Sequence, residues 1–232
     1  MTITTWNIRQ GGGKRIDKII QALTENSDTD IFILTEYRNN ANKERIKSAL
    51  NKLGFAYLYY PPTSSPMQNA VLIAAKQKFH FETFDILGVH RHRVIKIANA
   101  NLSLYGCYFP MNDPKKHIFD FLYEQSQLAN NKNIVITGDL NTGKHFIDEK
   151  GKTFCCADYF DLFEQNGIID AWRYVNGDKK EYSWYSYAGN GFRLDHFLVG
   201  SNLKNKIIDC QYIHAYRLNQ ISDHSMMKLI LR

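Results

Sequence analysis

Short apolar runs rich in β-branched residues recur along the chain, and several of them end at an acid or an amide. Residues 2–8 (TITTWNI) include Asn7, residues 30–34 (DIFIL) lead into Glu36, and residues 132–137 (KNIVIT) lead into Asp139. Runs of this kind are typical of strands buried inside a sheet. Polar residues at strand ends often lie along one rim of a sheet, where ligands bind. The pattern predicts a sheet-based fold with a polar site at one rim.

Amphipathic helices and further strands are expected between these runs. Helices are predicted at residues 14–26, 42–53, 114–128 and 157–166, from apolar spacing or from a proline at the start. Further strands are predicted at 55–60, 69–75, 79–87, 93–98, 101–109, 182–187, 193–199, 206–214 and 225–231. Neither a repeat nor a linker-like stretch divides residues 1–232, so a single domain is expected. Many short strands and a few helices favour two packed sheets with helices outside.

The charge of the chain bears on its partner. The net charge is +6 and the pI about 9.0, which favours a polyanion such as nucleic acid, although a lysine-rich surface also serves solubility. No apolar run approaches the length of a membrane span, and no signal peptide is evident. The four cysteines lack zinc-type spacing and are expected to be buried, reduced thiols in a cytoplasmic protein.

The polar residues at the strand ends suit one kind of chemistry. Glu36 offers hard oxygen ligands for Mg²⁺ or Mn²⁺. Asp139 and Asn141 are two positions apart, so both side chains can face one side of an extended segment and hold a water. Each residue taken singly is better explained by turn formation or capping. Together they indicate metal-assisted phosphodiester hydrolysis.

A histidine near the C-terminus adds to this set. His224 lies in the segment 221–225 (ISDHS), at the start of the last apolar run, and Asp195 is a candidate partner that would fix its tautomer. A single histidine at the mouth of a strand is more often structural than catalytic. Its case depends on the other carboxylates reaching the same place.

An ordered series of motifs resembles one protein superfamily, the endonucleases, exonucleases and phosphatases. The motifs are Thr5-Trp6-Asn7-Ile8, Thr35-Glu36, Tyr108-Phe109-Pro110, Gly138-Asp139-Leu140-Asn141, Phe192-Arg193-Leu194-Asp195-His196-Phe197 and Ser222-Asp223-His224. The resemblance implies a four-layered α/β sandwich, in which two mixed β-sheets are packed together and flanked by helices. The Tyr-x-Pro motif is most similar to the exonuclease III and apurinic/apyrimidinic endonuclease branch.

The resemblance also implies a role for each motif residue. Glu36 and Asn7 would lie at the metal, and Asp223 could lie at a second metal position. Asp139 would activate the attacking water with help from Asn141. Tyr108 would contact the scissile phosphate or stabilise the leaving oxygen, and His224, braced by Asp195, would bind a phosphate oxygen. Arg9 stands where some relatives carry an acidic residue.

The resemblance to this branch implies a substrate pocket made of three hydrophobic residues. By position in the motifs, Trp184, Phe192 and Leu194 would form a slot for a flipped-out abasic sugar, which is small enough to enter where a full nucleotide is not. Trp184 and Phe192 could instead be the hydrophobic core of a hairpin. Basic residues after the Tyr108 and Asp139 motifs, Lys115 and Lys144 among them, could follow the phosphate backbone or simply be solvated.

The expected activity is that of a Mg²⁺-dependent (or Mn²⁺-dependent) phosphodiesterase acting on double-stranded DNA. It would cleave 5′ to abasic sites, trim 3′ ends, and act as a monomer without a membrane partner. Alternatives on the same fold are a nonspecific DNase, an RNase or a small-molecule phosphatase. A non-catalytic nucleic-acid-binding module is disfavoured, because none of the expected catalytic positions is substituted.

Overall fold

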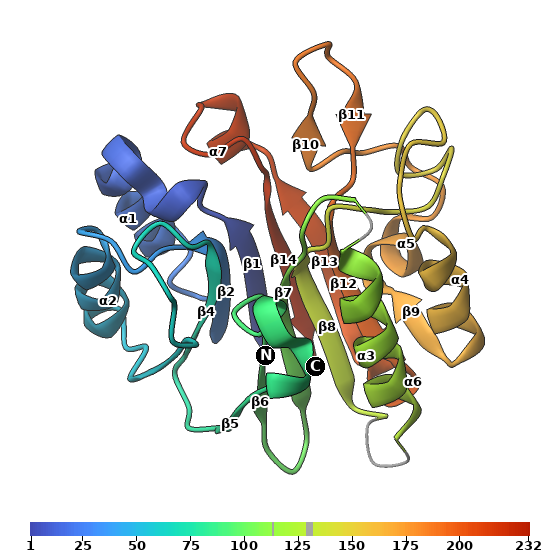
Figure 1. Cartoon of the computed structure of the whole chain (residues 1–232), viewed down its shortest axis with the longest axis horizontal. Helices are drawn as coiled ribbons and strands as arrows, with labels where there is room; N and C mark the ends of the chain where they lie inside the picture. The colour runs from blue at the N-terminus through green and yellow to red at the C-terminus, as the bar shows by residue number, and fades with distance from the viewer. Residues whose placement is uncertain (113, 129–131) are drawn as a thin grey trace.

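Two six-stranded β-sheets pack against each other in the computed structural model, which describes residues 1–112, 114–128 and 132–232 (Figure 1). The first sheet has the order β13-β14-β1-β2-β4-β3, with bounds Ile207–Ile213, Met226–Leu231, Thr2–Asn7, Ile31–Tyr37, Ala70–Ala75 and Tyr57–Tyr59. The second has the order β5-β6-β7-β8-β12-β9, with bounds His80–Thr83, Val94–Ala98, Ser103–Tyr108, Ile134–Asp139, Asp195–Gly200 and Ile168–Asp170. Both sheets are mixed, because β1 pairs with β2 and β7 with β8 in parallel.

Helices cover the outer face of each sheet. Helices α1 (Ile16–Glu25) and α2 (Lys43–Lys52) bury their apolar faces in one cluster with side chains of β1, β2 and β4. Helices α3 (Lys115–Gln127) and α4 (Asp158–Gln165) do the same against β7, β8 and β12. The order helix, sheet, sheet, helix confirms the predicted four-layered sandwich.

The core between the sheets is apolar and tightly packed. It includes Ile33 and Ile73 from the first sheet, and Val135 and Phe197 from the second. Gly106 lies in the middle of β7, and a Cβ atom there would meet the Ile73 side chain at 3.0 Å. That is closer than Cβ atoms ordinarily approach other carbons, so a glycine at this position allows the two sheets to come together.

Several short elements differ from the sequence prediction. The strand expected at 79–87 is β5 alone, and a 3₁₀ segment, η2 (Asp85–His90), follows it. The strand expected at 182–187 is only β10 (Trp184–Tyr185), paired with β11 (Gly191–Phe192) in a separate hairpin. The prediction missed β9 and four short helical segments: η1 (Gln10–Arg15), α5 (Ala171–Asn176), α6 (Ser201–Lys204) and α7 (Ala215–Leu218).

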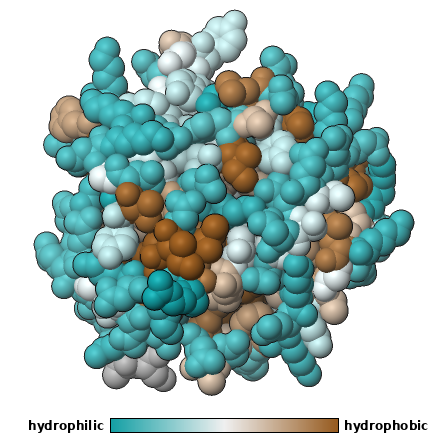
Figure 2. Space-filling view, turned by 180° about the vertical axis from the view of Figure 1, so that it is seen from behind, coloured by the Kyte–Doolittle hydropathy of each residue, from teal (hydrophilic) through white to brown (hydrophobic). Residues whose placement is uncertain are grey.

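The surface is mostly polar. Seen from behind, hydrophilic side chains cover most of the molecule, and apolar side chains form separate small patches (Figure 2). Within residues 1–112, 114–128 and 132–232, no helix combines the length and the apolar character that crossing a membrane requires. Cys107 and Cys210 are buried as expected, whereas Cys155 and Cys156 are partly exposed, which corrects the expectation of four buried thiols.

Candidate active site

The predicted polar residues converge at one end of the sandwich because of strand direction. Asn7 and Asp139 are the last residues of β1 and β8, and Tyr108 is the last of β7. Asp195 begins β12 and pairs directly with Asp139 across the antiparallel ladder. Strand β14 runs antiparallel to β1, so the residues that precede it, including His224, reach the same end. Each sheet therefore contributes part of one site.

Glu36 is turned toward this site by a β-bulge. The register between β2 and β4 shifts between Leu34 and Tyr37, and Glu36 has a left-handed φ of 54°. A bulge re-aims a side chain that a regular strand would point elsewhere, and a non-glycine residue at positive φ is an uncommon, strained conformation. Three donors then hold the carboxylate: the Asn7 amide at 3.2 Å, the Gln10 backbone N–H at 2.8 Å and the Tyr108 hydroxyl at 3.4 Å.

Asn7 links the two carboxylates of the site. Its Nδ2 donates to Glu36 Oε1 at 3.2 Å and to Asp139 Oδ2 at 2.9 Å, and its Oδ1 accepts the Arg9 backbone N–H at 2.8 Å. The amide nitrogen rather than the amide oxygen faces the carboxylates. For Asn7 to ligate a metal as predicted, its amide would have to turn and give up the bond from Arg9.

His224 lies between two buried carboxylates. Its Nδ1 is 2.8 Å from Asp195 Oδ2, and its Nε2 is 3.9 Å from Asp139 Oδ2. Burial disfavours the charged imidazolium, but Asp195 and Asp139 outweigh this effect and raise the pKa of His224 to about 10. Burial also raises the pKa of Asp139 to about 7, against the opposing charge of His224. The pair therefore combines a protonated histidine with an aspartate that can take up a proton near neutral pH.

Asp139 is positioned by a backbone that only glycine allows. Gly138 has a φ of 136°, and a Cβ atom there would lie 1.9 Å from the Cys107 carbonyl oxygen. After the strand, the Asn141 backbone N–H donates to Asp139 Oδ1 at 3.0 Å, and Asn141 itself has a φ of 50°. The Asn141 side-chain amide donates to the Phe109 carbonyl at 2.8 Å, which fixes its nitrogen on the loop after β7.

Tyr108 places a hydroxyl on the Glu36 side of the site, and its side chain is partly buried. Asn69 Nδ2 donates to its oxygen at 3.3 Å, and the Arg38 Nε in turn donates to Asn69 at 2.5 Å. Burial, together with the charges of Glu36 and Asp139, raises the pKa of Tyr108 to about 12. The hydroxyl therefore keeps its proton at neutral pH and can act as a donor.

A cavity of about 420 Å³ opens beside these groups. Glu36, Tyr108, Asp139, Asn141, Asp223 and His224 line its polar side, and Trp184, Phe192 and Leu194 belong to its apolar side. The Trp184 and Phe192 rings face each other across the hairpin with centroids 5.7 Å apart, and Trp184 lies 6.5 Å from the His224 ring. All three predicted pocket residues thus reach the cavity, together with Phe154 and Met111.

The carboxylates allow two metal positions to be compared. The ligand atoms of Asp139, Asp195 and His224 lie within 4.8 Å of one another, close enough for an ion. An imidazolium has no free lone pair, however, so this trio is better described as a cation bridging two carboxylates. Glu36 supplies hard oxygens oriented by three donors, which suits Mg²⁺ or Mn²⁺. Asp223 lies 3.7 Å from Arg9 Nε, so a cationic side chain already faces this carboxylate.

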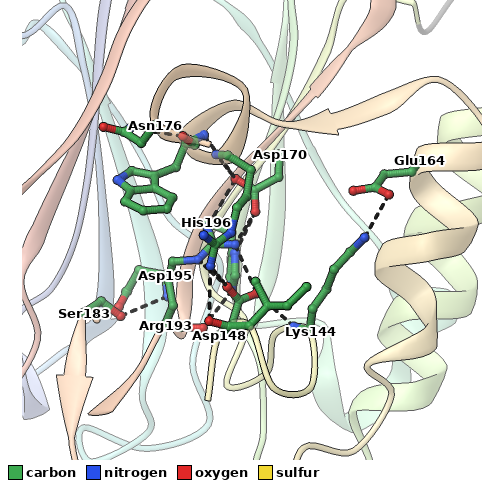
Figure 3. Close-up of polar contacts among 12 residues, drawn as sticks. Lys144, Asp148, Glu164, Asp170, Asn176, Ser183, Arg193, Asp195 and His196 are labelled. Atoms are coloured by element: carbon green, nitrogen blue, oxygen red, sulfur yellow. Dashed lines mark hydrogen bonds and ion pairs between the residues drawn. The ribbon is translucent and has the colours of Figure 1, made fainter. Parts of the chain in front are cut away.

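A buried ionic network supports the loop that follows Asn141. Arg193 immediately precedes the Leu194-Asp195 pair, and its Nε donates to Asp148 Oδ1 at 2.8 Å (Figure 3). The Arg193 Nη2 also donates to Asp170, and the Asp170 side chain caps the start of α5. The loop carrying Asp148 is thereby tied to β9 and β12. Lys144, one of the basic residues for which the sequence leaves both phosphate contact and a solvated surface position open, pairs with Asp161 and Glu164 of α4.

Several neighbours of the site have no signal in the local sequence. Three of them act through contacts with residues far away in the chain, which a local sequence pattern cannot predict: Asn69, Gln10 and Ser183. Lys115 is different. It lies on the same helical face as Ile118, Phe119 and Leu122, all buried, so helical spacing could have shown that its side chain points inward.

Comparison with known proteins bears out the fold and the resemblance. Residues 4–224 match the endonuclease/exonuclease/phosphatase family. An exodeoxyribonuclease from Bacillus subtilis (strain 168) is 28% identical over 173 residues, which are 62% of this chain and 68% of that protein. A variant of the 3′ phosphatase NExo from Neisseria, solved with a product DNA hairpin, superposes with a TM-score of 0.82 at 21% identity. An AP endonuclease from Archaeoglobus fulgidus gives the same values, and both alignments cover 100% of this chain and 99% of the other.

These two solved structures are distant in sequence and bear on the fold, whereas the family match extends over nearly the whole chain. The strand-end carboxylates, the buried imidazolium and the adjoining cavity lie within the matched residues. The chain belongs to the endonuclease/exonuclease/phosphatase family and is a phosphodiester hydrolase.

Proposed function

We propose that the protein is a Mg²⁺-dependent DNA nuclease that cleaves 5′ to abasic sites and trims 3′ ends. The observation that carries the proposal is the position of the Trp184 and Phe192 rings, here called the aromatic wall. Trp184 and Phe192 lie in the same 420 Å³ cavity as His224 and Asp139. A deoxyribose without its base can fit against these rings while its phosphate contacts the polar side.

The names of similar proteins support DNA as the substrate and leave the balance of activities open. They include an exodeoxyribonuclease, a 3′ phosphatase with a DNA hairpin and an AP endonuclease. The net charge of +6 suits a polyanion better than a small phosphorylated molecule. A nonspecific DNase, an RNase or a small-molecule phosphatase of the same family is the alternative.

The proposed roles follow from geometry and charge. Asp139 accepts a proton from the attacking water, because its raised pKa of about 7 suits a general base near neutral pH. His224, held protonated by Asp195, donates a hydrogen bond to a nonbridging phosphate oxygen. The Tyr108 hydroxyl, which lies beside Glu36, donates a hydrogen bond to the phosphate from that side of the site. Asn141 fixes the loop after Asp139. The Asn7 amide donates to both Glu36 and Asp139 and so holds the two carboxylates in place relative to each other.

Glu36 is the proposed metal ligand, and Asp223 and Asn7 are the further candidates. A bound Mg²⁺ would add positive charge at the phosphate and polarise the scissile bond. The residues of the chain then position the water, the phosphate and the sugar around it.

A single assay separates the alternatives. The protein is incubated with an abasic duplex, an intact duplex, a duplex with a recessed 3′-phosphate and single-stranded RNA, each with Mg²⁺ or with EDTA. Incision of the abasic duplex and release of the 3′-phosphate, both lost in EDTA and in Asp139→Asn, support the proposal. Equal cleavage of every substrate would favour a nonspecific nuclease, and binding without turnover would refute an enzymatic role.

The aromatic wall has its own test. We expect Trp184→Ala to lower kcat/KM on the abasic duplex by on the order of tenfold or more, since a stacked aromatic contributes about 1–3 kcal/mol. Cleavage of 3′ ends should fall less. Tyr185→Ala is the matched control, because Tyr185 is the next residue in β10 and is exposed outside the cavity. Equal losses on both substrates would assign Trp184 to the hairpin core instead.

A further inference from the structure

Two adjacent lysines at the start of α3 lie in very different surroundings. Lys116 is exposed and pairs with Asp120 one turn later, at 3.2 Å. Lys115 is 2% exposed and lines the cavity that contains Asp139 and His224. Lysine is rarely buried without a reason, because removing an ammonium group from water is costly.

The helix itself turns Lys115 inward. Lys115, Ile118, Phe119 and Leu122 are spaced at i, i+3, i+4 and i+7, and all four are buried. Since α3 starts shortly after the Tyr108 strand ends, its first turn lies beside the Asp139 loop. The Lys115 Nζ donates to the Asn141 carbonyl oxygen at 2.5 Å. The ammonium is thus fixed at the loop that carries Asp139 and Asn141, two residues of the proposed reaction centre.

The charge of Lys115 is poorly compensated in the cavity. The hydrogen-bond acceptor on Nζ is a neutral carbonyl, and none of the carboxylates in the described ranges lies within ion-pair distance of it. Burial lowers the pKa of Lys115 from its ordinary value. The neighbouring Cys155 and Cys156, and then Asp139, favour the charged form electrostatically, but burial outweighs them. An anion entering the cavity would add negative charge where these groups compensate the ammonium only in part.

We propose that Lys115 is a phosphate-binding residue of the active site, donating to a nonbridging oxygen of the substrate phosphate while it holds the Asn141 turn. The inference rests on the proposed nuclease function, because the anion that the cavity would receive is then the scissile or terminal phosphate of DNA. Lys115 and His224 would supply two positive charges to that phosphate, in addition to the metal.

The test compares Lys115→Met with Lys116→Met, two identical substitutions on neighbouring residues. The first readout is the affinity, in EDTA, for one duplex carrying either a recessed 3′-phosphate or a 3′-hydroxyl. We expect the wild-type protein and Lys116→Met to bind the phosphorylated end about tenfold more tightly, as a charge-assisted hydrogen bond implies. Lys115→Met should bind both ends equally. A purely structural role would weaken both complexes by the same factor.

The second readout is turnover with Mg²⁺. Lys115→Met should lower kcat/KM by on the order of 10²-fold, as the loss of one stabilising donor does, and Lys116→Met by less than about threefold. Lys115→Gln, which also removes the charge but keeps a polar end, replaces the methionine variant if that protein fails to fold. An unchanged preference for the phosphorylated end in a folded Lys115→Met protein, or no such preference in the wild type, would overturn the inference. A wild type that binds the phosphorylated end selectively but cleaves no DNA would overturn the proposed function and leave the Lys115 assignment intact.

Discussion

The positive charge of His224 depends more on Asp195 than on any other residue. Burial opposes protonation, and Asp195 makes the largest contribution that favours it. Asp195→Asn keeps the shape of the side chain but removes this charge, so we expect the imidazole to become neutral at pH 7. The loss of the phosphate-binding cation should lower kcat by on the order of 10²–10⁴-fold, with KM for DNA changed much less. Steady-state kinetics on a cleavable duplex measure both values.

The control for this substitution is Asp178→Asn, which removes an equal charge from an exposed position. It should leave kcat within about twofold of the wild type. If Asp195→Asn retains near-normal kcat while thermal unfolding shows an intact fold, then His224 does not act as an imidazolium in the rate-limiting step.

At this scale the sequence reveals the acids, the amide and the histidine, but not the residues that orient them. Glu36 and Asp139 stand out because each follows an apolar run. Asn69 and Gln10 do not, since their importance lies in bonds to Tyr108 and to Glu36 across the fold. The left-handed conformation of Glu36 is also hidden, because it depends on a bulge opposite β4.

At the scale of elements, long periodic segments are predictable and short ones are not. Strands such as β8 form a continuous apolar run, and helices such as α3 have enough residues to show helical spacing. The strand predicted at 79–87 extends into segment 85–90, because Ile86 and Leu87 are apolar. In the structure Ile86 and Val89 are exposed and Gly88 has a φ of 52°, so the apolar composition there does not reflect burial. Helix α5 starts because Asp170 caps it, which a six-residue segment hardly signals.

Ser183 connects the hairpin that forms the cavity wall to the segments that carry Asp195 and His224. The Ser183 Oγ accepts the backbone N–H groups of Leu194 at 3.0 Å and Asp195 at 3.3 Å, and its carbonyl accepts that of Ser225 at 2.9 Å. Ser183 therefore connects the base of the hairpin to both the Asp195 and the His224 segments (Figure 3 shows the Ser183–Asp195 contact).

Removing this hydroxyl should destabilise the protein and loosen the wall. Ser183→Ala leaves two buried N–H groups without an acceptor, so we expect a loss of about 1–3 kcal/mol in the free energy of unfolding. Urea denaturation measures it. Ser186→Ala is the matched control, because Ser186 accepts one N–H at 3.2 Å near the exposed tip, and its loss should be below about 0.5 kcal/mol. Equal losses would mean that Ser183 does not anchor the hairpin.

At the scale of the whole molecule, the site exists only where the two sheets meet. The first sheet and the segment before its strand β14 provide Asn7, Glu36 and His224, and the second provides Tyr108, Asp139 and Asp195. The resemblance implies this arrangement, but apolar periodicity cannot, since it gives no information on which sheet a strand joins. The buried Arg193 network has the same character: Asp148, Asp170 and Arg193 are far apart in sequence, and only the folded chain brings their charges together.

The same network makes the stability of the whole fold sensitive to acid. Burial alone would raise the pKa of Asp148 and of Asp170, but Arg193 outweighs it and holds both below the ordinary value. Carboxylates with lowered pKa stabilise the folded state fully above the unfolded pKa of about 3.9, and that stabilisation is lost as the pH falls below it. We therefore expect the free energy of unfolding, measured by urea denaturation between about pH 2.5 and 7, to fall steeply below about pH 4.

Asp148→Asn should be about 3–5 kcal/mol less stable at pH 7, because Arg193 and Asp170 stay buried with one partner fewer, and its stability should depend less on acid. Asp178→Asn should follow the wild-type curve, and parallel curves for all three proteins would show that the network does not control acid unfolding.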